Sequence, residues 1–223
     1  MDVGILVSGG KDSAYAHWLA SQKGYDIVKL ITMIPKVNDS WMFQQSNPKI
    51  MDLYSQTTET PIIKKTTPGE KESEINDLKN ALEGLEIEGI VTGVVNSNYQ
   101  RERVQKICEE IGIEMITPIW KKDPSKLLKN MIEEGFVSTI VSVSAKGLDE
   151  KWLSREINKK NLKKLKKLNQ KYKIHISGEG GEYETLALNS PLFKKRIKIT
   201  KAKKVWDGMR GRLEIEDAKL AKK

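Results

Sequence analysis

A glycine-containing hexapeptide at residues 8–13, Ser-Gly-Gly-Lys-Asp-Ser, joins an apolar run at residues 3–7 to a helix-like run that begins at Ser13. This order is typical of a β-strand that turns directly into a helix. The two glycines have no Cβ and let backbone N–H groups approach an anion, while the N-terminus of the following helix adds partial positive charge. Serine hydroxyls, the Lys11 ammonium and the Asp12 carboxylate belong to the same turn. The sequence therefore predicts a phosphate-binding turn, in which Asp12 holds a metal ion or caps the helix.

A plain structural turn is the alternative, because tight strand-to-helix turns also use glycine for its geometry alone. Six consecutive residues of this kind after a strand favour the phosphate-binding interpretation. Kinase-type γ-phosphoryl transfer is disfavoured, since a P-loop has four residues between its glycines followed by Gly-Lys-Ser/Thr, and this spacing is absent.

Strand-like and helix-like runs alternate through the first half of the chain. We expect strands at residues 3–8, 27–34, 61–66, 87–95 and 114–120, and helices at 13–23, 48–58, 70–84 and 99–111. Such β-α-β repetition predicts a doubly wound parallel sheet with helices on both faces. In these sheets ligands bind beyond the carboxyl ends of the strands, where the strand order reverses. The hexapeptide follows the first strand, which is where a nucleotide site is expected.

The character of the chain changes near residue 125. Beyond it we expect a helix at 125–134, a strand at 136–145, a basic helical stretch at about 149–171 and strand-like segments to residue 217. The sequence thus predicts an α/β nucleotide-binding domain at residues 1–125 and a smaller α+β substrate-binding domain at residues 126–223. The first part has 14 Lys/Arg and 18 Asp/Glu, whereas the second has 25 and 12. The basic second part can attract an acidic protein or nucleic acid.

A leucine stripe runs along the basic helical stretch. Leu162, Leu165 and Leu168 recur at every third residue among eight lysines between residues 159 and 173. This spacing favours an amphipathic helix packed on its own domain. A docking surface for an acidic partner or for RNA is the alternative.

A second glycine-rich segment, residues 178–186, contains three carboxylates and an aromatic ring. If residues 182–186 are extended, Glu182 and Glu184 share one face and Tyr183 points to the other. Carboxylates placed close together are unfavourable unless a cation or hydrogen-bond donors compensate them. The segment therefore favours binding of a metal ion or a cationic substrate, with a plain acidic turn as the alternative.

Cys108 is the only cysteine, which excludes an intramolecular disulfide and a cysteine metal cluster. Its helical spacing with Val104, Ile107 and Ile111 predicts a buried core residue. There is no run of about 18 apolar residues and no signal-like N-terminal segment. We therefore expect a soluble, cytoplasmic protein without membrane contact.

Five motifs carry a resemblance to a known family. They are the hexapeptide at 8–13, Ser-Trp-Met-Phe-Gln at 40–44, Ser-Asn-Tyr-Gln-Arg-Glu-Arg at 97–103, Gly-Leu-Asp-Glu-Lys-Trp-Leu at 147–153 and Gly-Glu-Gly-Gly-Glu-Tyr-Glu-Thr-Leu at 178–186. In this order they resemble the diphthine-ammonia ligase family of the N-type ATP-pyrophosphatase superfamily. The resemblance spans nearly the whole chain, and its last motif is far more specific than the nucleotide loop. Two departures, at Asn98 and Ser154, concern local geometry only.

The resemblance implies an ATP-pyrophosphatase fold and the last step of diphthamide synthesis. The carboxylate of diphthine, a modified histidine on translation elongation factor 2, is adenylated by ATP and then captured by ammonia. Lys11 and Mg²⁺, the latter held by Asp12, would stabilise the departing pyrophosphate. Free ammonium is the expected nitrogen donor, because the chain shows no glutaminase-like region.

The implied contacts fall into two groups. ATP would lie on Ser8, Gly9, Gly10, Lys11, Asp12 and Ser13, with its adenine near Thr32, Met33, Thr92 and Gly93. The substrate would lie near Tyr99, Gln100, Arg101 and Arg103 and near Glu179, Glu182, Tyr183 and Glu184. Trp41 or Trp152 would add an aromatic face for the trimethylammonium group of diphthine.

Two other functions are compatible with the same nucleotide loop. An ATP-pyrophosphatase that adenylates a tRNA base would suit the basic second half, although thiolation is disfavoured by the single cysteine. A non-catalytic nucleotide-binding sensor would bind ATP without releasing pyrophosphate. We also consider a weak RNA contact through the basic half and a homodimer.

Overall fold

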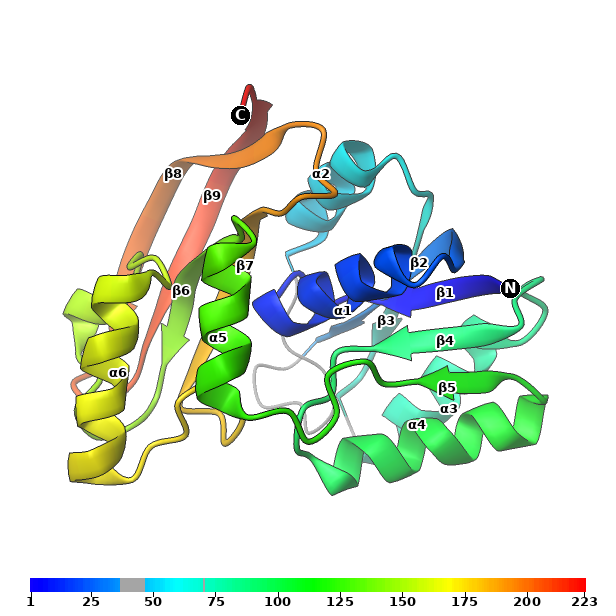
Figure 1. Ribbon diagram of the computed structural model, residues 1–223, viewed down its shortest axis with the longest axis horizontal. Coiled ribbons are helices and arrows are strands. Elements are labelled where there is room, and N and C mark those ends of the chain that lie inside the picture. Colours follow the sequence, from blue (N-terminus) through cyan, green and yellow to red (C-terminus); the bar gives the residue numbers. More distant parts are fainter. Residues whose placement is uncertain (37–46, 70) are drawn as a thin grey trace. The chain divides into compact units, whose positions relative to one another are not determined.

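The computed structural model describes residues 1–36, 47–69 and 71–223 and divides into two units, Met1–Trp120 and Lys121–Lys223 (Figure 1). Each unit has its own sheet. The motif at 40–44, with Trp41, lies outside the described residues.

The first unit contains a parallel five-stranded sheet with helices on both faces, which confirms the predicted fold class. Its strands are β1 (Asp2–Leu6), β2 (Asp26–Pro35), β3 (Ile62–Thr67), β4 (Gly89–Thr92) and β5 (Glu114–Ile116). Its helices are α1 (Lys11–Gln22), α2 (Pro48–Thr58), α3 (Lys71–Leu82) and α4 (Asn98–Ile111). The order β3-β2-β1-β4-β5 places β1 in the centre. The chain adds strands to one side of β1 and then to the other, so the order reverses beside the turn that follows β1.

Helices α3 and α4 cover one face of this sheet. Apolar side chains that point from the strands to this face pack against the two helices. The buried cluster consists of Ile31, Met33, Leu78, Ala81, Leu82, Ile87, Ile90, Val104, Ile107 and Cys108. The prediction of a buried Cys108 is confirmed, and burial raises the pKa of its thiol to about 11. A thiol with this pKa stays protonated at neutral pH, so it is not a nucleophile.

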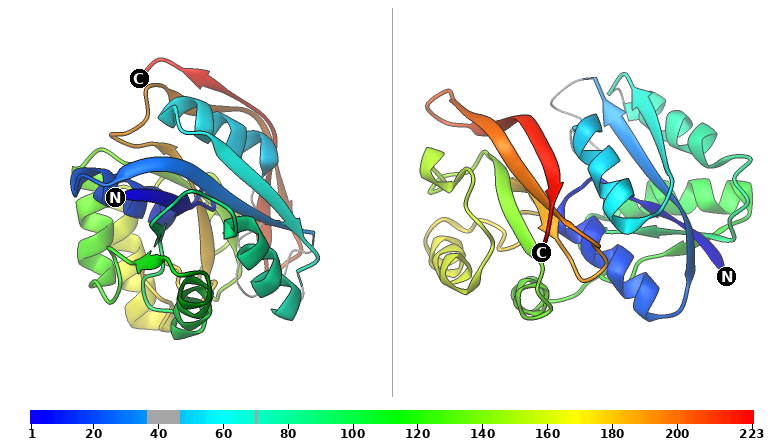
Figure 2. Two further views of the ribbon diagram at one scale, coloured as in Figure 1. Left: turned by 90° about the vertical axis from the view of Figure 1, so that its right-hand side faces the viewer. Right: turned by 90° about the horizontal axis from the view of Figure 1, so that it is seen from above.

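Helices α1 and α2 lie together on the other face (Figures 1 and 2). They are joined by a buried hydrogen bond of 3.0 Å between His17 Nδ1 and the Tyr54 hydroxyl. Burial lowers the pKa of His17 to about 4 and raises the pKa of Tyr54. Both groups are therefore neutral at physiological pH, and the pair fixes α1 against α2 without burying a charge.

The second unit is a smaller α+β structure, as predicted. Its antiparallel sheet has the order β7-β6-β9-β8, formed by β6 (Val137–Val143), β7 (Tyr183–Asn189), β8 (Arg196–Trp206) and β9 (Gly211–Ala221). Helices α5 (Pro124–Glu133) and α6 (Lys159–Tyr172) lie side by side, and a 3₁₀ helix, η1, covers Glu150–Trp152. In the described ranges, no helix has both the length and the apolar content needed to cross a bilayer.

The basic helix begins later than predicted. The expectation of helix from about residue 149 is wrong, because residues 154–157 run along β6 instead. Ser154 N–H donates to the Ile140 carbonyl at 2.9 Å, and Ile157 N–H donates to the Ser138 carbonyl at 2.8 Å. Asn158 then caps α6 by accepting from an N–H of the first turn at 3.0 Å. The leucine stripe is packed as predicted, since Leu162 and Leu165 are buried.

Candidate active site

The hexapeptide forms a closed turn at the carboxyl end of the central strand β1. Ser13 Oγ donates to the Gly10 carbonyl at 3.1 Å and accepts from the Ser8 N–H at 3.3 Å, and Gly10 N–H donates to Ser8 Oγ at 3.3 Å. Helix α1 starts immediately afterwards with Gly10 at the N-cap position, and no side chain caps it. An uncapped helix N-terminus directs N–H groups and partial positive charge toward the turn. This geometry fits an anion such as phosphate.

Lys11 and Asp12 form an ion pair at the start of α1. Lys11 is only 3% exposed, and its Nζ lies 2.7 Å from Asp12 Oδ2. The other carboxylate oxygen, Oδ1, is buried and has no hydrogen-bond partner among the described residues. A buried oxygen without a donor is costly in a folded protein. Asp12 Oδ1 is therefore suited to accept a cation or a donor from a ligand.

Gly93 brings the end of β4 against the turn formed by residues 8–13, which we call the phosphate turn. A Cβ added at Gly93 would lie 2.6 Å from the Ser13 nitrogen and 2.7 Å from the Asp12 carbonyl carbon. No side chain fits in this space, so any other residue would displace the start of α1. The predicted adenine region and the predicted phosphate region are thus adjacent in the fold.

Two buried threonine hydroxyls flank the end of β1. Thr92 lies opposite Leu6 in the register of β1 and β4, and Thr32 follows Ile31, the partner of Leu6 in β2. Both threonines are at most 1% exposed, and the Oγ1 atom of each has no hydrogen-bond partner in the described part of the chain. Met33 differs, because its side chain packs into the core cluster under α3 and α4.

Two arginines are held on aromatic rings near the start of α4. The Arg101 guanidinium carbon lies 5.1 Å from the centroid of the Trp120 ring, and that of Arg103 lies 3.4 Å from the Tyr99 ring. Arg103 Nη1 also donates to the Tyr99 carbonyl at 3.2 Å. Gln100 supplies the backbone N–H that Ser97 Oγ caps at 3.3 Å.

Neither Arg101 nor Arg103 forms an ion pair within the described ranges, and the Nε of each is buried without a hydrogen-bond partner there. Stacking on an aromatic face orients a guanidinium and leaves its edge for an anion. Motif analysis missed Trp120, because this residue lies at the end of the first unit and outside every motif. Both guanidinium groups are therefore suited to contact an anion, and they lie on the same unit as the turn at residues 8–13.

Residues 175–186, which we call the acidic loop and which run into the start of β7, belong to the second unit, and the loop is closed by one of its own carboxylates. Glu182 Oε1 accepts from the His175 N–H at 2.6 Å, and Oε2 accepts from the Gly180 N–H at 2.9 Å. The Ser144 hydroxyl donates to the Gly181 carbonyl and ties the loop to the end of β6. Glu182 precedes β7 and is turned back into the loop, which agrees with the alternative that the segment is a structured turn.

Tyr183 is also engaged within the loop. It is 2% exposed, and its hydroxyl donates to the Ile176 carbonyl at 2.6 Å. Gly178 has a φ of +79°, and a Cβ there would lie 2.6 Å from the Tyr183 carbonyl oxygen, so the position requires glycine. Glu179 and Glu184 are half-buried. Trp152, the other predicted aromatic, is 6% exposed, with Arg155 over its ring at 5.2 Å.

His175 is a loop residue that motif analysis missed. Its Nδ1 accepts from the Glu179 N–H at 3.4 Å and lies 3.1 Å from Ser177 Oγ. Because a backbone N–H can only donate, Nδ1 carries no proton and Nε2–H is the neutral tautomer. The sequence did contain a signal for His175, since the chain has only two histidines and the second lies three residues before the glycine-rich segment at residues 178–186.

The comparisons with known proteins cover both units. A family model described as the diphthamide synthase N-terminal domain matches residues 1–115, and one described as the diphthamide synthase C-terminal domain matches residues 123–221. The chain belongs to the diphthamide synthase family. The family assignment therefore rests on almost the whole chain, including the phosphate turn and the acidic loop.

Relatives within this family carry the name diphthine-ammonia ligase. The proteins of Bos taurus and Homo sapiens are each 34% identical over 220 residues, which is 88% of this chain and 82% of each relative. The protein of Mus musculus is 33% identical over 228 residues, or 92% of this chain and 85% of that relative. The match with these ligases does not favour tRNA-base adenylation or a non-catalytic sensor.

One solved structure resembles part of this diphthamide synthase family member. It is described as a predicted subunit of tRNA methyltransferase from Methanocaldococcus jannaschii. The TM-score is 0.43 at 18% identity, over 67% of this chain and 80% of that chain. A likeness at this level says nothing about function.

Proposed function

We propose that this protein is a diphthine-ammonia ligase, which uses ATP to convert the diphthine carboxylate into an amide. The observation that carries the proposal is the family match across both units, residues 1–115 and 123–221. The phosphate turn at the end of β1 supplies the matching chemistry, because it is built to receive an anion.

The reaction needs activation because a carboxylate would have to lose oxide when an amine attacks it. A carboxylate oxygen attacks the α-phosphorus of ATP, the bond to the β-phosphate oxygen breaks, and pyrophosphate leaves. Ammonia then attacks the acyl carbon, AMP leaves, and one proton is released. The protein contributes by positioning the reactants and stabilising charge on the leaving group.

The phosphate turn, Ser8–Ser13, is proposed to hold the β- and γ-phosphates. The uncapped N-terminus of α1 supplies partial positive charge, and Lys11 supplies a full charge from a buried position. Buried charges act more strongly than exposed ones because water does not screen them. Lys11 would therefore stabilise the departing pyrophosphate.

Asp12 is proposed to hold Mg²⁺. Magnesium is usually bound through one or two carboxylates together with substrate phosphates and waters, so it does not need a protein-only ligand cluster. In the described ranges, no three His, Cys, Asp or Glu residues gather into such a cluster. The buried Asp12 Oδ1, which has no donor among the described residues, fits this ion. When bound, Mg²⁺ would neutralise charge on the phosphates.

Thr32 and Thr92 are proposed to contact the adenosine part of ATP, together with the backbone at Met33 and Gly93. The two threonine hydroxyls are buried beside the phosphate turn and can donate and accept hydrogen bonds. Arg101 and Arg103 are proposed to bind the substrate carboxylate, and Tyr99 and Gln100 to shape that position.

The acidic loop is proposed to bind diphthine. Glu179 and Glu184 would attract its trimethylammonium group and the incoming ammonium ion, and accept the proton that ammonium loses. Glu182 and Tyr183 would support this indirectly by holding the loop in shape. The protein substrate is proposed to be translation elongation factor 2, with free ammonium as nitrogen donor, in the cytoplasm.

The decisive experiment measures pyrophosphate and AMP formation with ATP and ammonium, using either elongation factor 2 that carries diphthine or tRNA as the third substrate. We expect release with the modified elongation factor and a mass decrease of the factor consistent with amide formation. Release that depends on tRNA would contradict the proposal, and ATP binding without any release would favour the sensor.

A further inference from the structure

The β8–β9 hairpin has two regions of different charge balance. Residues 200–217, which include the turn, contain five Lys/Arg and four Asp/Glu. The segments 190–199 and 218–223, which meet at the open end, contain seven Lys/Arg and no Asp/Glu. We call these seven residues the basic end, and all are exposed: Lys194, Lys195, Arg196, Lys198, Lys219, Lys222 and Lys223.

In the region of the hairpin at residues 200–217, cations lie against carboxylates. Lys201 Nζ is 2.5 Å from Glu216 Oε2, and Arg212 Nη2 is 2.6 Å from Glu214 Oε1. The charge of this region is therefore largely compensated within the hairpin itself.

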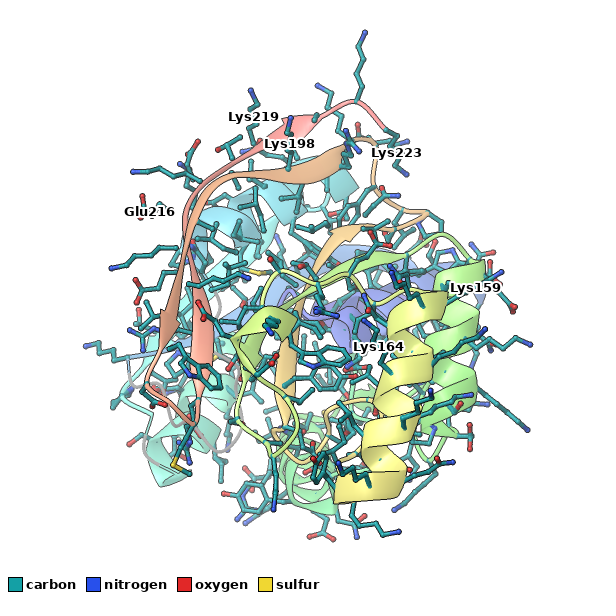
Figure 3. The ribbon with its side chains drawn as sticks, turned by 90° about the vertical axis from the view of Figure 1, so that its left-hand side faces the viewer. Lys159, Lys164, Lys198, Glu216, Lys219 and Lys223 are labelled. Carbon is teal, nitrogen blue, oxygen red and sulfur yellow. The ribbon has the colours of Figure 1, made fainter. Side chains whose placement is uncertain are left out.

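At the basic end, like charges face each other. Lys198 lies directly opposite Lys219 in the register of β8 and β9, next to the pair formed by Ile197 and Leu220. Ile197 is buried and both lysines are exposed, so the lysines occupy the outer face. Neither lysine forms an ion pair within the part of the chain that is described. Figure 3 shows them together near the open end, with Glu216 further along β9. Opposed like charges destabilise a strand pair.

Protection of a sheet edge does not account for this arrangement. Lysines on an edge strand prevent edge-to-edge pairing, and β8 is one of the two edge strands of its sheet. That role requires charge on β8 alone. Lys219 lies on β9, and Lys222 and Lys223 follow it. The basic end therefore carries more charge than edge protection requires.

The composition of the basic end distinguishes between acidic partners. Protein interfaces are depleted in lysine and are anchored by buried aromatic or aliphatic side chains. The exposed large hydrophobic residues of the described chain are Met1 and Met209, and neither belongs to the basic end. A phosphate backbone, in contrast, requires only a series of cations. Single strands also require aromatic stacking platforms, which the basic end lacks, so a base-paired nucleic acid such as an RNA hairpin fits it best.

We propose that the basic end of the β8–β9 hairpin binds the phosphate backbone of base-paired RNA without sequence preference. The ammonium groups of Lys198, Lys219 and Lys222 would each neutralise a phosphate, so binding would weaken steeply with salt. The proposal goes beyond amide formation and involves none of the residues assigned to ATP or diphthine.

The test measures binding of a fluorescein-labelled RNA hairpin to the full chain by anisotropy between 50 and 200 mM salt. The triple variant Lys198→Gln, Lys219→Gln, Lys222→Gln should bind about tenfold or more weakly at the lowest salt, and the salt slope should fall by roughly 2–3. Two control variants remove the same charge elsewhere: Lys201→Gln, Lys203→Gln, Lys204→Gln on the same hairpin, and Lys163→Gln, Lys166→Gln, Lys167→Gln on α6. Each control should change affinity by less than about threefold if contacts at the basic end dominate.

Equal losses in all three variants would overturn the proposal, because net charge alone would then explain binding. No measurable RNA binding, or tighter binding of polyglutamate than of RNA, would also overturn it.

The single variant Lys219→Glu adds a stability readout. It should weaken RNA binding and raise the melting temperature by roughly 1–3 °C, since it places opposite charges across the strands. Unchanged RNA affinity in this folded variant would reject the site. Pyrophosphate release by the variant should be unaffected, and this assay tests the ligase proposal separately.

Discussion

The phosphate turn and the acidic loop use similar residue types in opposite ways. Both combine closely spaced glycines with charged side chains, and each lies at one end of a strand. In the phosphate turn, Asp12 Oδ1 and the nearby hydroxyls of Thr32 and Thr92 are buried without hydrogen-bond partners among the described residues. In the acidic loop, both Glu182 oxygens and the Tyr183 hydroxyl are bonded to the loop backbone.

This difference separates polar groups that can bind a ligand from polar groups that stabilise a loop. A buried polar atom without a partner costs stability, and a bound ligand can remove that cost. A carboxylate whose two oxygens are both hydrogen-bonded, as in Glu182, stabilises the loop and cannot be diverted to a ligand without losing those bonds. Substitutions in the two loops should therefore have opposite effects on stability and on ligand binding.

The largest effect is expected at Lys11 and Asp12. Lys11→Ala or Asp12→Ala should lower the rate of AMP formation at least about a hundredfold, roughly 3 kcal/mol in transition-state energy, because each removes a charge beside the departing pyrophosphate. Circular dichroism should show an intact fold. Lys23→Ala, which removes a charge at the exposed far end of α1, is the control and should turn over normally. Near-normal turnover of both site variants would exclude the turn from the chemistry.

Acid should destabilise the helix that carries the phosphate turn. The pKa of His17 is about 4 in the folded state against 6.5 in the unfolded state. The folded state therefore favours the neutral imidazole, and this contribution to the stability of the fold is complete above pH 6.5 and is lost as the pH falls toward 4. The loss should reach about 3 kcal/mol at the acid end. His17→Gln, which keeps a side chain able to accept from Tyr54, should flatten this part of the profile. Thermal unfolding between pH 3.5 and 8 measures it, and an equally steep profile in the variant would assign the effect to other groups.

Glu182→Gln should destabilise the acidic loop. An amide offers one acceptor oxygen where the carboxylate offers two, so one of the hydrogen bonds from His175 or Gly180 is lost at a cost of about 2 kcal/mol. Faster exchange of these two amide protons would show the effect locally, while the affinity for ATP should not change. Glu134→Gln, an exposed residue after α5, is the control. Normal amide protection with a raised KM for the protein substrate would instead mean that Glu182 contacts diphthine.

The smallest expected effects compare two hydroxyl deletions. Thr92→Val should leave the free protein as stable or more stable, yet weaken ATP binding about fivefold, near 1 kcal/mol. Tyr183→Phe should lose about 1 kcal/mol of stability, because it removes a satisfied bond to Ile176, and should leave ATP binding unchanged. Urea unfolding and isothermal titration calorimetry measure both variants. The comparison between the loops fails if Thr92→Val destabilises the free protein as much as Tyr183→Phe does.

Local patterns determined the parts of this protein that depend on neighbouring residues. The β-α alternation of the first unit, the turn after β1 and the leucine face of α6 follow from periodicity and from glycine placement within a few residues. The turn geometry of residues 8–13 could be expected for the same reason, because its hydroxyls bond within the hexapeptide itself.

Tertiary structure decided the features whose partners are distant in the sequence. Residues 154–157 lie along β6 because Ile140 and Ser138 offer backbone partners, which overrides their local tendency to continue a helix. Ser144 ties down a loop more than thirty residues away, and Thr92 is buried beside a turn about eighty residues earlier. Hydrogen bonds and burial depend on which groups the fold brings together, so the distinction between the unsatisfied Oδ1 of Asp12 and the satisfied carboxylate of Glu182 exists only in the folded chain.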